Sequence, residues 1–199
     1  ERMYPESVAP PSSANVTHIY TIGTELKFTV PGFIFGLWMY VCDSSPAGGY
    51  QLSLWEANGD RSGSFKVATM TGTKTTPGWL YMPFGYYEVN PAKRYIVCFN
   101  TSQKKYPTLQ GGIGQFSQVN YTFITPISAL FQLGHDANLF TTYTSNPNDN
   151  FYTDVEFYPY SKVNVMYRAL VDMTDVWRAP SEYPAYWERV LVSGDGSSG

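Results

Sequence analysis

Residues 150–158 read NFYTDVEFY, and they have a counterpart far upstream in residues 25–40, which read ELKFTVPGFIFGLWMY. Both stretches are rich in aromatic and β-branched side chains and are bounded by Gly, Pro or Asn, as β-strands commonly are. We expect the late stretch to pair with the early one and to close the sheet. A chain that returns in this way predicts a β-sandwich rather than the cleft of an enzyme.

Within residues 33–41 the side chains alternate with a period of two, which is the period of a strand. Leu37 and Met39 are the expected core pair. The alternation therefore turns Trp38 and Tyr40 to the opposite face.

The alternation in residues 79–89 assigns Met82 and Phe84 to the core and Tyr81 to the outside. Residues 104–106 look like a loop, and residues 126–133 fit either a helical turn or a strand. Further strands are expected at 17–22, 25–30, 50–56, 65–72, 93–100 and 162–171. The chain is thus predicted to be all-β, an antiparallel jelly-roll-like β-sandwich with a short irregular C-terminal extension.

Composition narrows the class of protein. The 199 residues suffice for one well-buried core, and the charged fraction of 15% lies below the globular norm of about 25%. A net charge of −3 argues against a nucleic-acid partner, which requires a basic face. The sequence has no apolar run near 18 residues, so we expect no membrane insertion.

The two cysteines, Cys42 and Cys98, leave two alternatives open. They form one disulfide if their strands are neighbours, or they are two half-buried free thiols. A metal site on this pair is not expected, because His18 and His135 do not stand at ligand spacing.

Four stretches of the sequence, taken in order, resemble a known protein family. The stretches GTELKFTVPGFIFGLWMY, YQLSLWEANGD, PGWLYMPFGYYEVNPAKRYIVCF and LFQLGHDANLFTTYTSNPNDNFYTDVEF resemble the DUF4082 domain over residues 15–158. The chain departs from the usual closing motif at Tyr152-Thr153. The resemblance implies a β-sandwich module of uncharacterised function, found in bacterial extracellular multidomain proteins and in bacteriophage tail proteins. The opening PESVAPPSSANVTHIYTIGTEL looks more like the phage minor-tail versions.

This resemblance divides the chain into four parts. Residues 1–14 form an extended, proline-bearing N-terminal arm, and residues 15–158 form the domain. Residues 159–192 form a C-terminal extension that docks or makes an oligomer contact. Residues 193–199, SGDGSSG, have the composition of a flexible linker.

Catalytic motifs are weak. Asp154 and Glu156 lie at i and i+2 of a strand, with Cα atoms about 6.5–7 Å apart. We interpret them as a solvated outer face beside the inward Val155 and Phe157, rather than as a hydrolytic pair. There is no nucleophile elbow and no phosphate-binding loop. We expect no enzyme activity and no cofactor.

Calcium has weak candidates in Asn148, Asp149 and Asp154, which offer oxygen ligands at close spacing. The alternative, which we favour, is a hydrogen-bonded Asn/Pro turn in which such residues cap their own backbone.

Aromatic side chains are the strongest binding candidates. Trp38, Tyr40, Tyr81 and Tyr86 supply flat faces that suit a sugar ring or a protein partner. For Trp38 and Tyr81 three alternatives stay open: a cover from the C-terminal extension, a subunit contact, or ligand stacking. Trp79, directly after Pro-Gly, is expected to be a plug in the core or at its rim.

The C-terminal extension is rich in aromatic residues. Trp177, Tyr183, Tyr186 and Trp187 predict docking on the chain's own sandwich or on a neighbour, with a homotrimer as one possible assembly.

The resemblance, together with these aromatic surfaces, therefore implies a non-enzymatic component of a phage virion, displayed on the virion surface. Its expected partners are other virion proteins, further copies of itself and a host surface glycan. The alternative is a carbohydrate-binding module of a secreted bacterial protein, and a glycan-active enzyme is a distant third.

Overall fold

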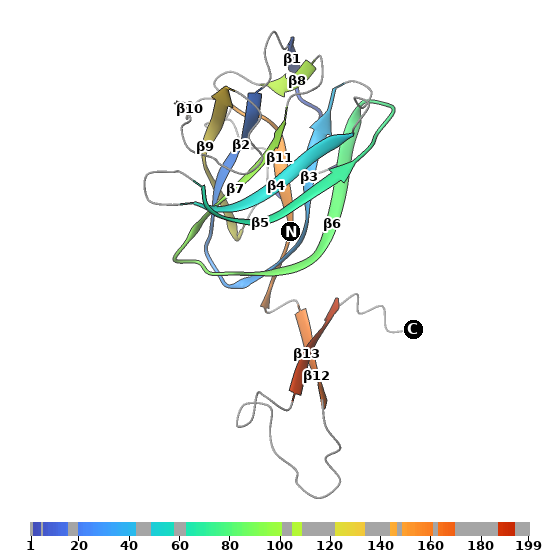
Figure 1. Cartoon of the computed structure of the whole chain (residues 1–199), viewed down its shortest axis with the longest axis vertical. Helices are drawn as coiled ribbons and strands as arrows, with labels where there is room; N and C mark the ends of the chain where they lie inside the picture. The colour runs from blue at the N-terminus through green and yellow to red at the C-terminus, as the bar shows by residue number, and fades with distance from the viewer. Residues whose placement is uncertain are drawn as a thin grey trace, which may run out of the picture. The chain divides into compact units, whose positions relative to one another are not determined.

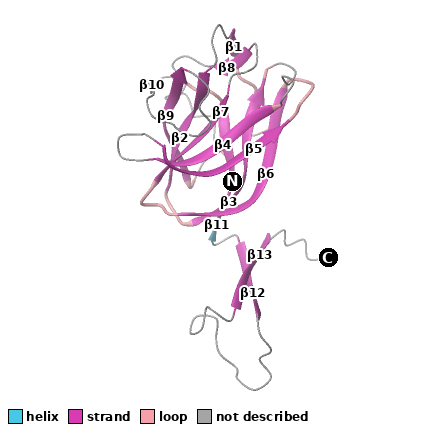
Figure 2. Cartoon of the chain, viewed as in Figure 1, coloured by secondary structure: helices cyan, strands magenta, loops and turns pink. Residues whose placement is uncertain are grey.

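A computed structural model of the chain describes residues 2–4, 6–15, 20–42, 49–57, 63–100, 105–108, 122–133, 144–146, 149–160, 163–169 and 187–193. The chain forms two compact units, Glu1–Phe157 and Tyr158–Gly199. Figure 2 shows that strands dominate the described parts of both units. In the described part of the chain, no helix is long and apolar enough to cross a membrane.

The first unit contains two main sheets (Figure 1). The larger has six strands, in the order β10 (Thr144–Asn146), β9 (Ile124–Leu133), β2 (Tyr20–Phe28), β7 (Arg94–Asn100), β4 (Tyr50–Ala57) and β5 (Gly63–Gly72). The smaller has three strands, in the order β11 (Thr153–Pro159), β3 (Gly32–Val41) and β6 (Gly78–Val89). The short strands β1 (Ser12–Asn15) and β8 (Lys105–Thr108) form a separate antiparallel pair.

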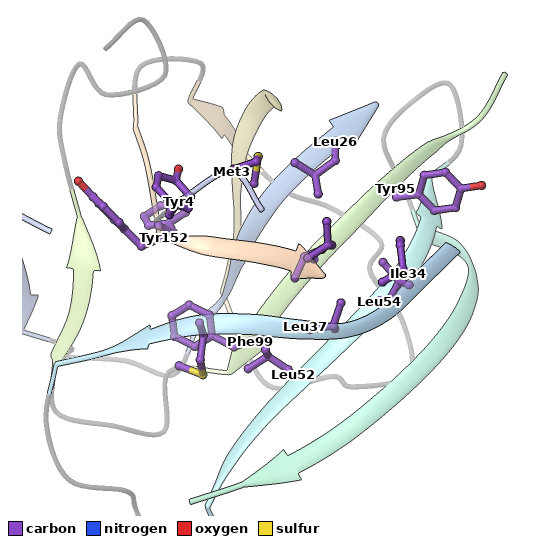
Figure 3. Packing of buried hydrophobic residues seen from close by; sticks show 14 of the residues in the cluster. Met3, Tyr4, Leu26, Ile34, Leu37, Leu52, Leu54, Tyr95, Phe99 and Tyr152 are labelled. Atoms are coloured by element: carbon purple, nitrogen blue, oxygen red, sulfur yellow. The ribbon is translucent and has the colours of Figure 1, made fainter. Parts of the chain in front are cut away.

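The core is assembled from both main sheets. Leu26, Leu52 and Phe99 come from the six-stranded sheet, and Ile34 and Leu37 come from the three-stranded one. Figure 3 shows these side chains gathered among the strands, and each is at most 1% exposed. Burial of this apolar surface is the main force that holds the two sheets together. The predicted all-β, sandwich-like fold is confirmed, and the jelly-roll arrangement stays a prediction.

The expected return of the chain is confirmed, because β11 is the hydrogen-bonded neighbour of β3. The predicted core pair Leu37 and Met39 is completely buried, and Met82 is 4% exposed. Phe84 is half-buried and packs against the same core.

Three expectations about strands need correction or completion. Residues 20–28 form one strand, β2, instead of two strands that meet near residue 23. The expected loop at residues 104–106 contributes to β8, whose Tyr106 pairs with Ala14 of β1. Residues 126–133, whose sequence fitted either a helical turn or a strand, belong to the strand β9.

Gly23 explains why β2 continues through a residue that usually interrupts strands. A Cβ atom at this position would lie 2.1 Å from the carbonyl oxygen of Val97 on the neighbouring β7. The glycine therefore permits a close approach of two strand backbones instead of ending a strand.

The second unit contains one described antiparallel pair, β12 (Val163–Ala169) with β13 (Trp187–Ser193). The expected strand at 162–171 is thus confirmed in its central part. The expectation of an irregular extension is wrong for residues 187–193, because they form a strand that pairs with β12. Trp177, Tyr183, Tyr186 and residues 194–199 lie outside the described residues, as does the side chain of Trp187.

Candidate functional site, the outer face of the three-stranded sheet

The candidate site is the face of the three-stranded sheet that points away from its core side, called here the outer face. In the register of β3 with β6, Trp38 lies opposite Tyr81 and Tyr40 lies opposite Trp79. Their neighbour Leu37 is buried in the core, so these four aromatic side chains belong to the other face. The ring centroids of Trp38 and Tyr81 are 4.6 Å apart, and Tyr40 meets Trp79 edge to face at 5.6 Å.

Residues 2–4, called here the N-terminal segment, lie against this face. The guanidinium carbon of Arg2 is 3.6 Å from the ring centroid of Trp38 and 5.0 Å from that of Trp79. Both distances are within the range of an attractive cation–π contact. Arg2 Nε is also 3.6 Å from Oδ2 of Asp154. Ring faces and opposite charge therefore hold this side chain.

Arg2 is only 13% exposed in its side chain. Burial lowers the pKa of Arg2, while the negative charges of Asp154 and Glu156 raise it. Among the described residues, Nε and Nη2 of Arg2 have no hydrogen-bond partner. The guanidinium is thus desolvated without full compensation by hydrogen bonds.

Asp154 fixes the backbone of the N-terminal segment. Its Oδ1 accepts the N–H of Met3 and its Oδ2 accepts the N–H of Tyr4, both at 2.9 Å. Oδ1 also accepts the N–H of Val155 at 2.8 Å. Burial of this fully enclosed carboxyl raises its pKa to about 7, although the three backbone donors and Arg2 lower it.

Tyr4 anchors the segment by stacking and by its hydroxyl group. Its ring stacks on Trp79 at 5.4 Å and contacts Tyr152 at 5.2 Å. Its hydroxyl donates to Oδ1 of Asn150 at 2.9 Å, and the same oxygen accepts the N–H of Tyr152. Trp79 Nε1 donates to the carbonyl oxygen of Val8 at 2.8 Å, so the cover extends beyond Tyr4. Figure 3 shows Tyr4 beside Tyr152.

The interpretation of Asp154 and Glu156 as a solvated pair is wrong for Asp154, which is completely buried. The alternation itself was right, because Val155 and Phe157 are the core residues of β11. Glu156 is half-buried, and its Oε2 accepts the indole N–H of Trp38 at 3.0 Å. Strand parity identifies the face of a side chain, but it does not say what covers that face.

The four predicted ligand-binding residues divide into two groups. Trp38, Tyr40 and Tyr81 come together on the outer face, where Arg2 covers Trp38. Tyr86 is separate from this group and is 53% exposed, with an edge-to-face contact to Phe33 at 5.7 Å. The expectation for Trp79 is confirmed, because it is half-buried and packs against the core.

The calcium candidates have different structural roles. Asn148 lies outside the described residues, and Asp149 is half-buried. The oxygens of Asp154 are engaged by the N-terminal segment. Asn150 Oδ1 accepts the N–H of Tyr152, which is the hydrogen-bonded turn that we favoured. The described residues contain no group of three or more His, Cys, Asp or Glu side chains that could hold a metal ion.

Arg2 and Glu25 are charged residues that the sequence did not single out. Glu25 of β2 is completely buried; its Oε1 accepts Arg94 Nη1 at 3.1 Å and its Oε2 accepts Ser128 Oγ at 3.2 Å. A carboxylate inside a largely buried strand is a signal for such a buried polar contact. For Arg2 the sequence carries no comparable signal: its ion pair with the exposed Glu6 at 3.6 Å is local, but its buried partners Trp38 and Asp154 are distant along the chain.

Cys42 and Cys98 do not form a disulfide, so the alternative of two separate thiols is the correct one. Cys42 is half-buried and Cys98 is buried. Burial raises the pKa of Cys98 to about 12, which suppresses the reactive thiolate. His18 and His135 lie outside the described residues.

Comparison with known protein families places the chain in one family. The model of the domain of unknown function DUF4082 matches residues 7–153. This range begins before the expected residue 15 and ends at the first residue of β11, before Asp154. No curated protein and no solved structure is significantly similar to the chain. Because the family model covers well over half of its residues, the chain belongs to the DUF4082 family.

Proposed function

We propose that this chain is a non-enzymatic structural module of a bacteriophage virion, a minor tail, fibre or capsid-decoration component at the particle surface. The observation that carries the proposal is the outer face, where Asp154, Trp38 and Trp79 bind the N-terminal segment through its backbone and side chains. A surface that binds a polypeptide segment in this way suits the assembly of subunits. The likeness of residues 5–26 to phage minor-tail versions supports the particle as the setting.

The buried carboxylates favour a structural role over a hydrolytic one. Asp154 is occupied by the backbone of the N-terminal segment, and Glu25 by Arg94 and Ser128. A general acid or base must reach a substrate proton, whereas both of these groups are completely enclosed.

The test is whether the chain is physically part of the virion. The full chain, tagged in its native genetic setting, is expected to co-sediment with density-purified virions in a constant ratio to the major capsid protein. Immunogold labelling is expected on the particle exterior. Recovery only as free protein in the culture medium, with none on particles, would overturn the assignment and favour the secreted bacterial module.

A second candidate, binding of a host glycan, rests on one observation. Tyr86 is the large hydrophobic residue that is most open to solvent in the described structure, at 53% exposed. Phe33 supports its ring from the side, so the ring has a defined orientation on the surface. Such a ring can stack on the apolar face of a sugar.

This second candidate is tested by glycan-array binding of the full chain. We expect Tyr86→Ala to abolish binding, with Lys27→Ala, an exposed residue of β2, as the matched control. Equal binding by the wild type and Tyr86→Ala would exclude Tyr86 as the sugar platform.

A further inference from the structure

The N-terminal segment is bound in the way that a separate peptide would be. Two consecutive backbone N–H groups, of Met3 and Tyr4, donate to one carboxylate. The Arg2 guanidinium occupies the ring faces of Trp38 and Trp79. Backbone hydrogen bonds combined with side-chain anchors are the general means of peptide recognition.

The receptor for this segment is built without the segment itself. Trp38 belongs to β3, Trp79 to β6 and Asp154 to β11, so all three strands of one sheet contribute. Without an occupant, the Asp154 carboxylate would lose two of its backbone donors. Since loss of a partner by a buried charged group is costly, the receptor strongly favours an occupied state.

The connection from the segment to the body of the unit allows another arrangement. Residues 5–11 join the segment to β1, which is fixed to β8 from Ser12 onward. Val8 in this connection accepts the indole N–H of Trp79, so residues 2–8 exchange together and residues 9–11 form the link. Pro10 and Pro11 favour extended backbone, and three extended residues span up to about 10 Å, which suits an adjacent copy whose outer face lies beside β1.

We propose that the N-terminal segment also binds the outer face of a second copy of this chain, so that neighbouring copies exchange their residues 2–8. The exchange recreates the same contacts between molecules that exist within one, which makes a second copy the partner with the best fit. Arg2 and Asp154, which form an ion pair at 3.6 Å, both lie just outside the matched range 7–153. The inference rests on the proposed assembly function and names its partner.

The first experiment tests the receptor with a peptide. A fluorescent peptide of residues 1–9, ERMYPESVA, is titrated against full-length wild type and full-length Arg2→Glu by fluorescence anisotropy. In the wild type the attached segment competes at a high effective concentration. The Arg2→Glu segment is repelled by Asp154, so this variant is expected to bind the peptide at least about tenfold more tightly.

Two controls make this result specific to Arg2. The peptide carrying Arg2→Glu is expected not to bind. Full-length Lys27→Glu, which reverses an exposed charge on β2, is expected to behave as the wild type. Full-length Arg2→Gln serves as a second receptor if Arg2→Glu does not fold. Equal peptide affinity for the wild type and both Arg2 variants would overturn the proposal.

The second experiment tests the second copy as the partner. Arg2→Glu retains the wild-type outer face, but its own N-terminal segment binds weakly. Asp154→Asn retains the wild-type N-terminal segment, but its outer face binds a segment weakly. Native mass spectrometry of a mixture, with one chain isotopically heavy, is expected to show mixed dimers at least about tenfold above either homodimer. A mixture of Lys27→Glu with Asp154→Asn gains no contact by exchange and is expected to show no such excess.

The outcomes separate this inference from the proposed function. Peptide binding without mixed dimers would overturn the second copy as the occupant. Absence of both, in a chain that still co-sediments with virions, would overturn the exchange and leave the virion role in place.

Discussion

The carboxylate of Asp154 accepts the backbone N–H of Met3 at 2.9 Å, across a sequence separation of 151 residues. Met3 is completely buried, and so is Asp154. The contact therefore ties the first described residues to the strand that closes the sandwich. The N-terminal segment and β11 stabilise each other, and neither is an independent appendage.

Removal of the Asp154 carboxyl is expected to destabilise the first unit. In Asp154→Ala the N–H groups of Met3 and Tyr4 lose their acceptor, and the N–H of Val155 loses its bond to the same carboxylate. The two donors of the N-terminal segment alone cost about 2–6 kcal/mol of unfolding free energy. Urea denaturation measures this loss, with Glu88→Ala, an exposed carboxylate on β6, as the control. Equal loss in both variants would show that the N-terminal contact contributes nothing.

The titration of Asp154 is expected to appear in the pH dependence of stability. Burial raises the pKa of Asp154 to about 7 in the folded chain, compared with its ordinary value of 3.8. Between these values the folded chain binds more protons than the unfolded chain. This carboxyl therefore favours folding at low pH, and its contribution is lost as the pH rises through about 7.

The measurement compares wild type with Asp154→Asn, which does not titrate, by urea denaturation at pH 5, 6, 7 and 8. Relative to this variant, the wild type should lose stability between pH 5 and 7 with a slope that approaches about 1.4 kcal/mol per pH unit, and the slope should fall to zero above the folded pKa of about 7, where both states are ionised. Parallel pH profiles would mean that Asp154 keeps the same ionisation in the folded and unfolded chains.

The sequence predicted what depends on local pattern. The alternation in residues 33–41 placed Leu37 and Met39 in the core, and the structure confirms both. The Pro-Gly pair before Trp79 indicated a plug, and Trp79 packs against the core residues Tyr4 and Tyr152 at the outer face. For Leu37 and Met39, neighbours along the strand determine the face, so a short window of sequence contains the information.

The cover of the outer face could not be predicted in this way. The burial of Asp154 depends on residues 2–4, which no local pattern connects to β11. Arg2 and Trp38 are likewise separated in sequence, and a single arginine near a proline-bearing arm has many solvated alternatives. Gly23 led to the wrong expectation of two strands for a related reason. Its role is to leave room for the carbonyl oxygen of Val97 on β7, which the sequence around Gly23 does not reveal.

A hydroxyl pair between the two main sheets offers a further test. Thr153 Oγ1 of β11 donates to Thr24 Oγ1 of β2 at 2.8 Å, and both residues are at most 1% exposed. Valine has nearly the shape of threonine, so either Thr24→Val or Thr153→Val leaves one buried hydroxyl without this partner. Each single variant is expected to cost about 1–3 kcal/mol of unfolding free energy.

The double variant is expected to be nearly as stable as the wild type, because it removes both polar groups together. A double-mutant cycle by urea denaturation measures the coupling energy between Thr24 and Thr153. If the two losses simply add, the hydroxyl groups do not interact in the folded chain.

The close approach of β2 to β7 at Gly23 gives the last prediction. A Cβ atom on Gly23 would lie 2.1 Å from Val97 O and 2.7 Å from Cys98 Cα, which are backbone atoms that cannot move separately from their strand. At Gly72 a Cβ atom would instead meet Met82 Cε at 2.8 Å, the end of a flexible side chain that can turn away. The two positions therefore differ in the cost of the same added methyl group.

Gly23→Ala is expected to lower the unfolding free energy by about 3 kcal/mol or more, because β2 and β7 must separate to admit the methyl group. Gly72→Ala is expected to cost less than about 1 kcal/mol, since only the end of Met82 has to move. Thermal and urea denaturation of both variants measure the difference, and hydrogen exchange at the β2–β7 amide groups locates it. If Gly23→Ala were as stable as Gly72→Ala, the two strand backbones would have to lie further apart than the structure places them.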